Sequence, residues 1–218
     1  MRVALPLKQL GLVAVGARYD VAPLEQPQIE RRRIWHDSAY WIPLLLVYTG
    51  CRREEVAKAM VSDIELIDGI WVLRVRRTEA GRVKTESSVR DVPLADEALR
   101  LGFLSYVDHL RSAGAAALFP ELGAQPGKFG DIFYKKWWRG FERAGLVPEG
   151  KDMHSIRHFV ATELAVAGVS EERRADLLGH TVTSSETART YTKRTPLVIL
   201  QQIVNMIPVV TSAIMPLR

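Results

Sequence analysis

Residues 49–55 read Thr-Gly-Cys-Arg-Arg-Glu-Glu, and they lie at the junction of two expected helices. The apolar run before them predicts a helix that begins at Asp37 or Ser38 and ends at Gly50, because glycine suits a helix C-terminus. Apolar residues at helical spacing after the junction predict a second helix over 53–60. The stretch therefore places an arginine and a glutamate at a helix boundary, where a simple helical domain would not need them.

The next part of the chain changes its period and predicts a small sheet. Ile70–Val75 indicates one strand and Ser88–Leu94 a second, with Ala80-Gly81 as the turn between them. We expect the two strands to pair in an antiparallel sheet.

Most of the remaining chain is expected to be helical. Apolar residues three or four apart over 99–110 predict one helix, and a stripe at steps of four over 129–141 predicts another. From His154 the pattern is helical nearly to the end of the chain. Ser170 is a suitable cap for one of these helices, and Pro196 suits the first position of the last helix.

The composition of the 218 residues is that of a globular protein, with 47% apolar and 25% charged residues. The single cysteine excludes an internal disulfide framework and a Cys-rich zinc module. No apolar run approaches the roughly 20 residues that a membrane span needs. We expect a cytoplasmic protein from a reducing compartment.

Basic residues exceed acidic ones, and some of them are clustered. The 30 Lys and Arg against 25 Asp and Glu give a net charge of +5, which is compatible with a polyanionic partner but common in unrelated proteins. Two basic clusters are Arg31-Arg32-Arg33 and Lys135-Lys136-Trp137-Trp138-Arg139. Taken alone, each cluster is better explained as the solvated face of a helix.

Polar residues of catalytic type occur in four segments. Glu55 follows Arg52 by three residues, and His154 and Arg157 are also three apart, on one face of an expected helix. His180 follows Gly179 at an expected helix end, and Tyr191 lies further along the chain. Each alone has a structural explanation, such as a surface ion pair worth roughly 0.2–0.5 kcal/mol.

Together and in this order, the segments resemble the catalytic domain of the tyrosine recombinases, the phage integrase family. The resemblance runs from about Trp41 to Tyr191 and implies a DNA breaking-rejoining fold, mainly α with a small antiparallel β-sheet. It places Arg52 in the first arginine box, with Glu55 in support and Asp63 at its close. Lys84, the one lysine between Lys58 and Lys128, matches the family's catalytic lysine on a β-hairpin. The resemblance implies this catalytic set: Arg52, Lys84, His154, Arg157, His180 and Tyr191.

These residue types suit transfer of a phosphodiester. Two arginines can hold the non-bridging oxygens through permanently charged, bidentate hydrogen bonds, so neither a metal nor another cofactor is expected. A tyrosine has a pKa of about 10 and needs a base, for which His154 is suited near neutral pH. The resemblance implies Lys84 as the general acid and His180 as a hydrogen-bond donor to the phosphate.

The resemblance also implies the domain organisation and the partners. We expect a lead-in over 1–34, the catalytic domain over 35–194, and an apolar tail over 195–218 that packs on its own domain or on a neighbouring subunit. The partners are double-stranded DNA and three further copies, in a homotetramer on paired sites. Family members usually carry an N-terminal DNA-clamping domain, which the lead-in is too short to form, so we expect a fragment or a reduced version, encoded by a bacterium or a phage. Candidate contacts to the DNA backbone are Arg31, Arg32, Arg33, Lys135, Lys136, Arg139 and Lys151.

Three other functions compete with a site-specific recombinase. A type IB topoisomerase-like enzyme would nick and close DNA with a similar site. A regulator on the same scaffold would bind DNA without catalysis. A metallohydrolase would need His154, His158 and His180 to converge on a metal, although the glutamate of a zinc hydrolase helix is missing between the first two.

Overall fold

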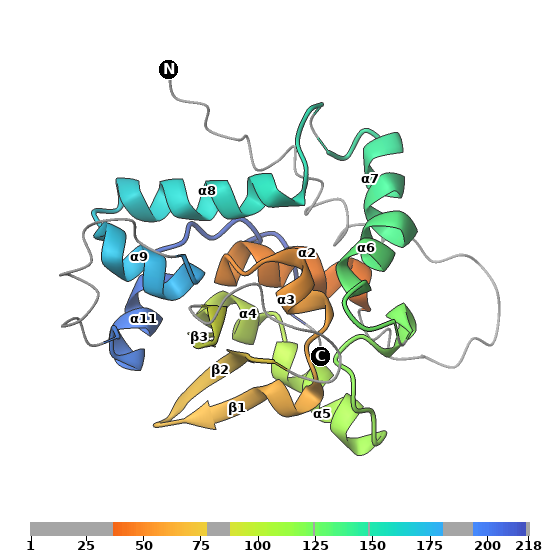
Figure 1. Ribbon diagram of the computed structural model, residues 1–218, viewed down its shortest axis with the longest axis horizontal. Coiled ribbons are helices and arrows are strands. Elements are labelled where there is room, and N and C mark those ends of the chain that lie inside the picture. Colours follow the sequence, from red (N-terminus) through yellow and green to blue (C-terminus); the bar gives the residue numbers. More distant parts are fainter. Residues whose placement is uncertain (1–36, 78–87, 124, 148, 181–193, 217–218) are drawn as a thin grey trace.

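The computed structural model describes residues 37–77, 88–123, 125–147, 149–180 and 194–216. Helices predominate in these residues, with one three-stranded antiparallel sheet of order β1-β2-β3 (Figure 1). This confirms the predicted fold class. The strands are β1 (Ile64–Ile67), β2 (Ile70–Val75) and β3 (Arg90–Pro93). The helices are α2 (Ser38–Thr49), α3 (Arg53–Ala57), α4 (Asp96–Arg100), α5 (Phe103–Ser112), α6 (Phe129–Phe133), α7 (Arg139–Arg143), α8 (Met153–Val166), α9 (Glu171–Leu178) and α11 (Leu197–Val204), with a π-helical turn (Tyr134–Trp138) between α6 and α7.

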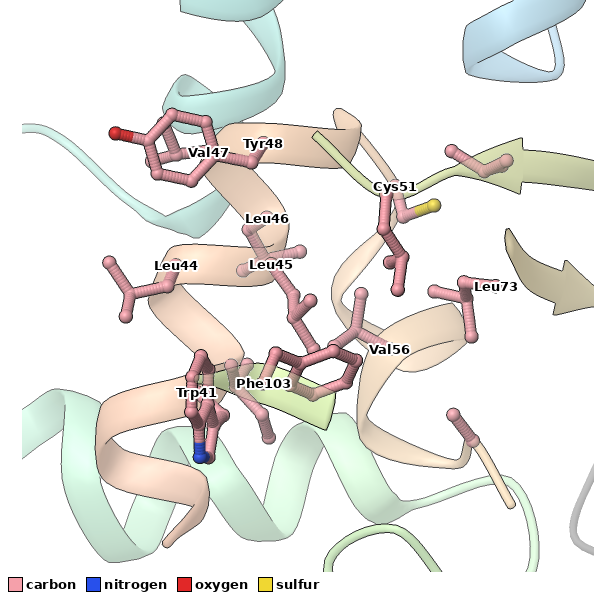
Figure 2. Close-up of a cluster of buried hydrophobic side chains, with 14 of the residues drawn as sticks. Trp41, Leu44, Leu45, Leu46, Val47, Tyr48, Cys51, Val56, Leu73 and Phe103 are labelled. Carbon is pink, nitrogen blue, oxygen red and sulfur yellow. The ribbon is translucent and has the colours of Figure 1, made fainter. Parts of the chain in front are cut away.

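Helix α2 forms the centre of the core, and every one of its residues is buried. A helix that is apolar all round must be covered on all sides. Figure 1 shows α2 in the middle of the molecule, with α8 on one side and the sheet on the other. In Figure 2, Leu44 and Tyr48 lie on one side of α2, while Val56 and Leu73 of other elements lie on the other.

The predicted ends of α2 are confirmed. The Asp37 carboxylate accepts a hydrogen bond from the Ala39 N–H at 2.8 Å, as an N-cap does. Gly50 follows the helix with a left-handed backbone at φ 63°, and its N–H donates to the Leu46 carbonyl. A Cβ at Gly50 would collide with a methyl carbon of Leu178, so both the conformation and the space favour glycine.

The sheet contains one strand that the sequence analysis did not predict. β1 pairs with β2 through a tight turn at Asp68-Gly69, where both residues have positive φ. β2 then pairs with β3, which is the shorter form of the strand expected over 88–94. The predicted turn at Ala80-Gly81 lies outside the described residues.

Three predicted helix boundaries are wrong. The helix expected over 53–60 ends at Ala57, because Ala59 and Val61 instead exchange backbone hydrogen bonds with residues 116–118. The helix expected over 99–110 is two helices, α4 and α5, separated at Gly102 with φ 92°. The last helix ends at Val204, well before the end of the chain.

The apolar tail packs on its own domain within the described residues. α11 lies against β3 and β2, and its buried side chains are Leu200, Ile203 and Val204. Further on, the Thr211 hydroxyl is hydrogen-bonded to the Tyr48 hydroxyl at 2.7 Å and donates to Glu97. No helix among the described residues is long and apolar enough to cross a membrane.

Candidate active site

Arg52 lies at the N-cap position of α3, immediately after the Gly50 turn. Its backbone N–H donates to one carboxylate oxygen of Glu55 at 2.8 Å, and its Nη1 donates to the other at 2.7 Å. Its Nη2 donates to the carbonyl of Gly179 at 2.9 Å. The side chain is 25% exposed, so part of the guanidinium faces solvent.

Arg157 is the second arginine of the site, and its side chain is buried. Asp152 caps α8, which places His154 in the first turn and Arg157 one turn later on the same face. The Arg157 Nη1 donates to the carbonyl of Gly50 at 2.7 Å, and its Nη2 donates to the carbonyl of Leu178 at 2.5 Å. The guanidinium group of Arg157 is thereby hydrogen-bonded to the C-terminal ends of two helices, α2 and α9.

The acceptors of both arginines have a common origin. The carbonyls at the ends of α2 and α9 have no partner within their own helices, and they carry the negative end of each helix dipole. Gly179 ends α9 with a left-handed backbone at φ 70°, which turns the chain away from the helix. The turns at Gly50 and Gly179 thus expose the carbonyl groups that accept hydrogen bonds from Arg52 and Arg157.

Glu55 is the carboxylate whose charge acts on Arg157, and it does so without forming an ion pair. Arg157 forms no ion pair with any carboxylate of the described residues, and its buried Nε finds no hydrogen-bond partner among them. Burial, and then the positive charge of Arg52, lower the pKa of Arg157 to about 10. The two guanidinium groups repel each other electrostatically, so an anion bound beside both would be stabilised.

Two histidines lie beside the arginines. Burial, followed by the charges of His158, Arg157 and Arg52, lowers the pKa of His154, although Asp152 opposes the shift. Partial burial and the charges of Arg157 and Arg52 lower the pKa of His180 to about 4. Both imidazoles are therefore neutral at pH 7, a state in which each ring can accept a proton.

An open hollow of about 450 Å³ brings part of the predicted site together. Its lining includes three of the predicted residues, Arg52, His154 and Arg157. His180 lines a second hollow of about 290 Å³. The carbonyls of Leu178 and Gly179, which accept from Arg157 and Arg52, come just before His180 in the chain.

The two supporting residues have different partners. Glu55 is buried and bridges two arginines, Arg52 and Arg90. Burial acts to raise the pKa of Glu55, but the charges and hydrogen bonds of these arginines outweigh it and lower the pKa. Asp63 is buried elsewhere, where it accepts from the Met60 N–H at 2.9 Å and from Arg76 at 2.6 Å.

Other predicted residues lie outside the described part of the chain. They are Lys84, Tyr191, Arg31, Arg32 and Arg33. Their roles stay predictions.

The described basic cluster adjoins the hollow through one aromatic ring. Lys135, Lys136 and Arg139 are exposed, on the π-helical turn and the start of α7. The Arg139 guanidinium lies 5.7 Å from the centroid of the Tyr134 ring, and Arg53 lies 5.6 Å from the same centroid. Arg53 and Tyr134 line the hollow, as does Asp152, which follows the half-buried Lys151. Basic side chains therefore lie both at the arginine pair and on the π-helical turn and α7, with Tyr134 between them, while Glu54 and Asp152 also line the hollow.

The three histidines of the metallohydrolase alternative are all described. The rings of His154 and His158 meet edge to face with centroids 4.6 Å apart. Within the described residues, no three His, Cys, Asp or Glu side chains form a group that could hold a metal.

The sequence analysis did not recognise the place of Arg90 in this site. Arg90 is buried on β3, on the same face of the strand as the core residue Val92. A charged residue in phase with an apolar core residue was the signal that could have identified it. Tyr134 was also missed, because it lies outside the apolar stripe that runs in steps of four over 129–141.

Comparisons with known proteins bear on the family and the fold. The family model described as Phage integrase family matches residues 28–196. The structure of the XerH site-specific recombinase bound to difH substrate, in a pre-cleavage complex, is similar with a TM-score of 0.54 and 20% identity. The similarity covers 87% of this chain and 49% of that one, so this chain spans about half the length of the XerH chain and shares its fold. XerA recombinase matches with a TM-score of 0.43 and 17% identity, over 86% of this chain and 66% of that one. A search of curated proteins found no match.

Proposed function

Since this chain belongs to the phage integrase family, we propose that it is a site-specific DNA recombinase that cuts and rejoins strands through Tyr191. The substrate is double-stranded DNA, and the intermediate is a 3′-phosphotyrosyl link. The observation that carries the proposal is the arginine pair, in which a buried Arg157 that forms no ion pair among the described residues lines one hollow together with a partly exposed Arg52. A phosphodiester in this hollow would place its negative charge beside both guanidinium groups.

The reaction requires stabilisation of charge on the phosphate. As Tyr191 attacks phosphorus, negative charge collects on the non-bridging oxygens, and the free N–H groups of Arg52 and Arg157 bind them. The donors are already fixed on helix-end carbonyls, so they need no reorganisation at the moment of reaction. Loss of one preorganised donor of this kind costs on the order of 3 kcal/mol in the barrier.

Bonds and protons balance in each direction. The Tyr191 oxygen forms a bond to phosphorus as the bond to the 5′ oxygen of the next nucleotide breaks. His154, neutral at pH 7, accepts the tyrosine proton, and Lys84 donates a proton to the leaving 5′ oxygen. His180 donates a hydrogen bond to the phosphate. The reverse attack by a 5′ hydroxyl rejoins a strand, and the energy of the phosphodiester is kept in the protein–DNA link, so ATP is not needed.

The DNA partner extends beyond the reacting phosphate. We place the backbone on both sides of it over the cluster of Lys135, Lys136 and Arg139, and near Lys151. The working assembly is a homotetramer on two paired sites. The tail supports this because its residues Val198, Met206, Val209 and Met215 are apolar and half or more exposed.

Covalent capture on DNA tests the proposal. A pool of nicked suicide duplexes, tiled across the DNA that flanks the gene, is incubated with the protein, in buffer with and without EDTA. An adduct that survives denaturing electrophoresis is expected in both buffers. Tyr191→Phe is expected to form none.

Tyr134→Phe is the matched control, because Tyr134 lines the hollow and its hydroxyl donates to Glu142 at 3.1 Å. It is expected to form the adduct. Absence of an adduct with the wild-type protein on every duplex would overturn the proposed function.

A further inference from the structure

We infer that Arg90 is a positioning residue of the proposed reaction, which locks Arg52 and the end of α9 in place without touching the DNA. Arg90 comes from β3 and is 5% exposed in its side chain. It contacts residues of three separate segments: Glu55 and Cys51, Ser88, and Leu177. The inference rests on the proposed function for its effect on cleavage.

The donors of Arg90 are all engaged inside the protein. Its Nε donates to the carbonyl of Leu177 at 2.8 Å. Its Nη1 faces the carbonyl of Ser88 at 2.9 Å and one oxygen of Glu55 at 3.4 Å. Its Nη2 faces the other oxygen of Glu55 at 3.0 Å and the sulfur of Cys51 at 3.4 Å. A guanidinium has five N–H groups, and these contacts account for all five, so none is left for a phosphate.

Arg52 and Arg157 differ from Arg90 in this respect. Arg52 is 25% exposed and lines the 450 Å³ hollow, and Arg157 has an Nε without a partner among the described residues. Arg90 lines only the second hollow. The three arginines therefore divide into two that are available to an anion and one that is committed to the protein.

Arg90 acts on Arg52 by two routes. Through Glu55, both guanidinium groups share one carboxylate, so Arg90 fixes the oxygens to which Arg52 donates. Through Gly179, its guanidinium packs against the backbone whose carbonyl accepts from Arg52, because a Cβ at Gly179 would lie only 2.6 Å from the Arg90 Nη1. Gly179 also immediately precedes His180. One buried side chain thus sets the relative positions of Arg52 and His180.

Arg90→Lys tests the inference, because lysine keeps the charge beside Glu55 but cannot reach Leu177 and Ser88 at the same time. Arg100→Lys is the matched control. Arg100 also pairs with a carboxylate, Glu97, and donates to two carbonyls of another segment, but none of these residues lines the hollow. Arg90→Met is a more drastic variant, because it removes both the charge and the hydrogen-bond donors. If it fails to fold, the result for Arg90→Lys still tests the inference.

The first readout is hydrogen exchange of the free protein, which needs no DNA. In Arg90→Lys the amides of residues 175–180 are expected to exchange about ten times faster, while those of α5 do not change. Arg100→Lys is expected to leave 175–180 unchanged and to accelerate exchange in residues 205–216. Unchanged exchange at 175–180 in Arg90→Lys would overturn the inference, whether or not the protein cleaves DNA.

The second readout separates DNA binding from cleavage. Binding is measured in a Tyr191→Phe background and single-turnover cleavage at saturating suicide duplex. Arg90→Lys is expected to keep its Kd within about twofold and to cleave about 100-fold slower, the scale of a 1 Å misplacement of a catalytic group. Cleavage at the wild-type rate, or equal slowing in Arg100→Lys at equal loss of Tm, would contradict the inference. An absence of cleavage by the wild-type protein would refute the proposed function alone, since the exchange readout stands without it.

Discussion

Arg157 donates to two main-chain carbonyls and forms no ion pair with the carboxylates of the described residues. Carbonyl groups fix the direction of a guanidinium but carry only partial charge, so they offset the positive charge of the side chain only in part. Arg52 is compensated by Glu55, which it shares with Arg90. At the scale of single residues, the site is thus built to hold one more negative charge.

The two carbonyls make Arg157 sensitive to a conservative change. Arg157→Lys keeps a charge but cannot donate to Gly50 and Leu178 together, and we expect single-turnover cleavage to fall about 100- to 1000-fold. Arg174→Lys is the control, because Arg174 also donates to two carbonyls, those of Val169 and Ala161, outside the hollow. Both cleavage rates are measured on the suicide duplex. An equal fall in rate in the two variants would contradict a special role for Arg157, because loss of carbonyl hydrogen bonds outside the hollow would then have the same effect.

The lowered pKa of His154 predicts the pH dependence of cleavage. A base with a lowered pKa stays neutral at a lower pH, so the second-order rate constant of cleavage should hold down to pH 6.5 and fall only below it. His158 contributes to this lowering, so His158→Gln should raise the pKa of His154 and move the acid limb to higher pH. Half-maximal activity above pH 6.5 in the wild-type protein would contradict this, as would an unmoved limb in the variant.

Helix ends, rather than helix faces, assemble the site at the scale of elements. Gly50 ends α2, Gly179 ends α9, and the carbonyls exposed there bind Arg52 and Arg157. The helix α8 contributes its first two turns. Each of these ends depends on local chemistry, either a capping carboxylate or a glycine with positive φ.

Substitution of two glycines separates backbone strain from the contact with Arg90. Gly168 and Gly179 have φ of 83° and 70°, so alanine at either costs about 1–2 kcal/mol of stability. A Cβ at Gly168 meets nothing within 4 Å, whereas one at Gly179 collides with the Arg90 guanidinium. We therefore expect Gly179→Ala to lower both the cleavage activity and the thermal stability of the protein. Gly168→Ala should lower the thermal stability alone. Thermal unfolding and the adduct assay measure the two effects.

The elements that could be predicted are those set by neighbouring residues. The cap at Asp37, the stop at Gly50 and the cap at Ser170 are local, and the structure confirms them. The hairpin of β1 and β2 could also have been predicted, since Asp-Gly at 68–69 is a strong signal for a tight turn. It was missed because β1 is only four residues long. The early end of α3 could not be predicted from the local sequence, because it depends on hydrogen bonds to the distant residues 116–118.

The candidate site could be predicted in part for the same reason. His154 and Arg157 are one helical turn apart, so their proximity follows from the sequence. The contacts of Arg157 with Gly50 and of Arg52 with Gly179 span 107 and 127 residues, and only the folded chain brings them together. Arg90 belongs to this second kind, with Leu177 87 residues away.

We expect the basic cluster of Lys135, Lys136 and Arg139 to govern how the whole molecule binds DNA. Each phosphate contact releases counterions, so loss of one contact lowers the slope of log Kd against log salt concentration by about 1. We expect this change for Lys135→Gln and for Arg139→Gln. Arg74→Gln on the sheet, where Arg74 pairs with Glu65 and Asp91, should leave the slope unchanged. Unchanged slopes in all three variants would remove the cluster from the DNA interface.

The central claim is that one tyrosine becomes linked to DNA beside the arginine pair, and peptide mapping of the adduct tests it most directly. The adduct is digested with protease and nuclease, and the peptide that carries the nucleotide is identified by mass spectrometry. We predict a nucleotide esterified through its 3′ phosphate to Tyr191. A nucleotide on Tyr134, on a histidine or on any other side chain would contradict the account.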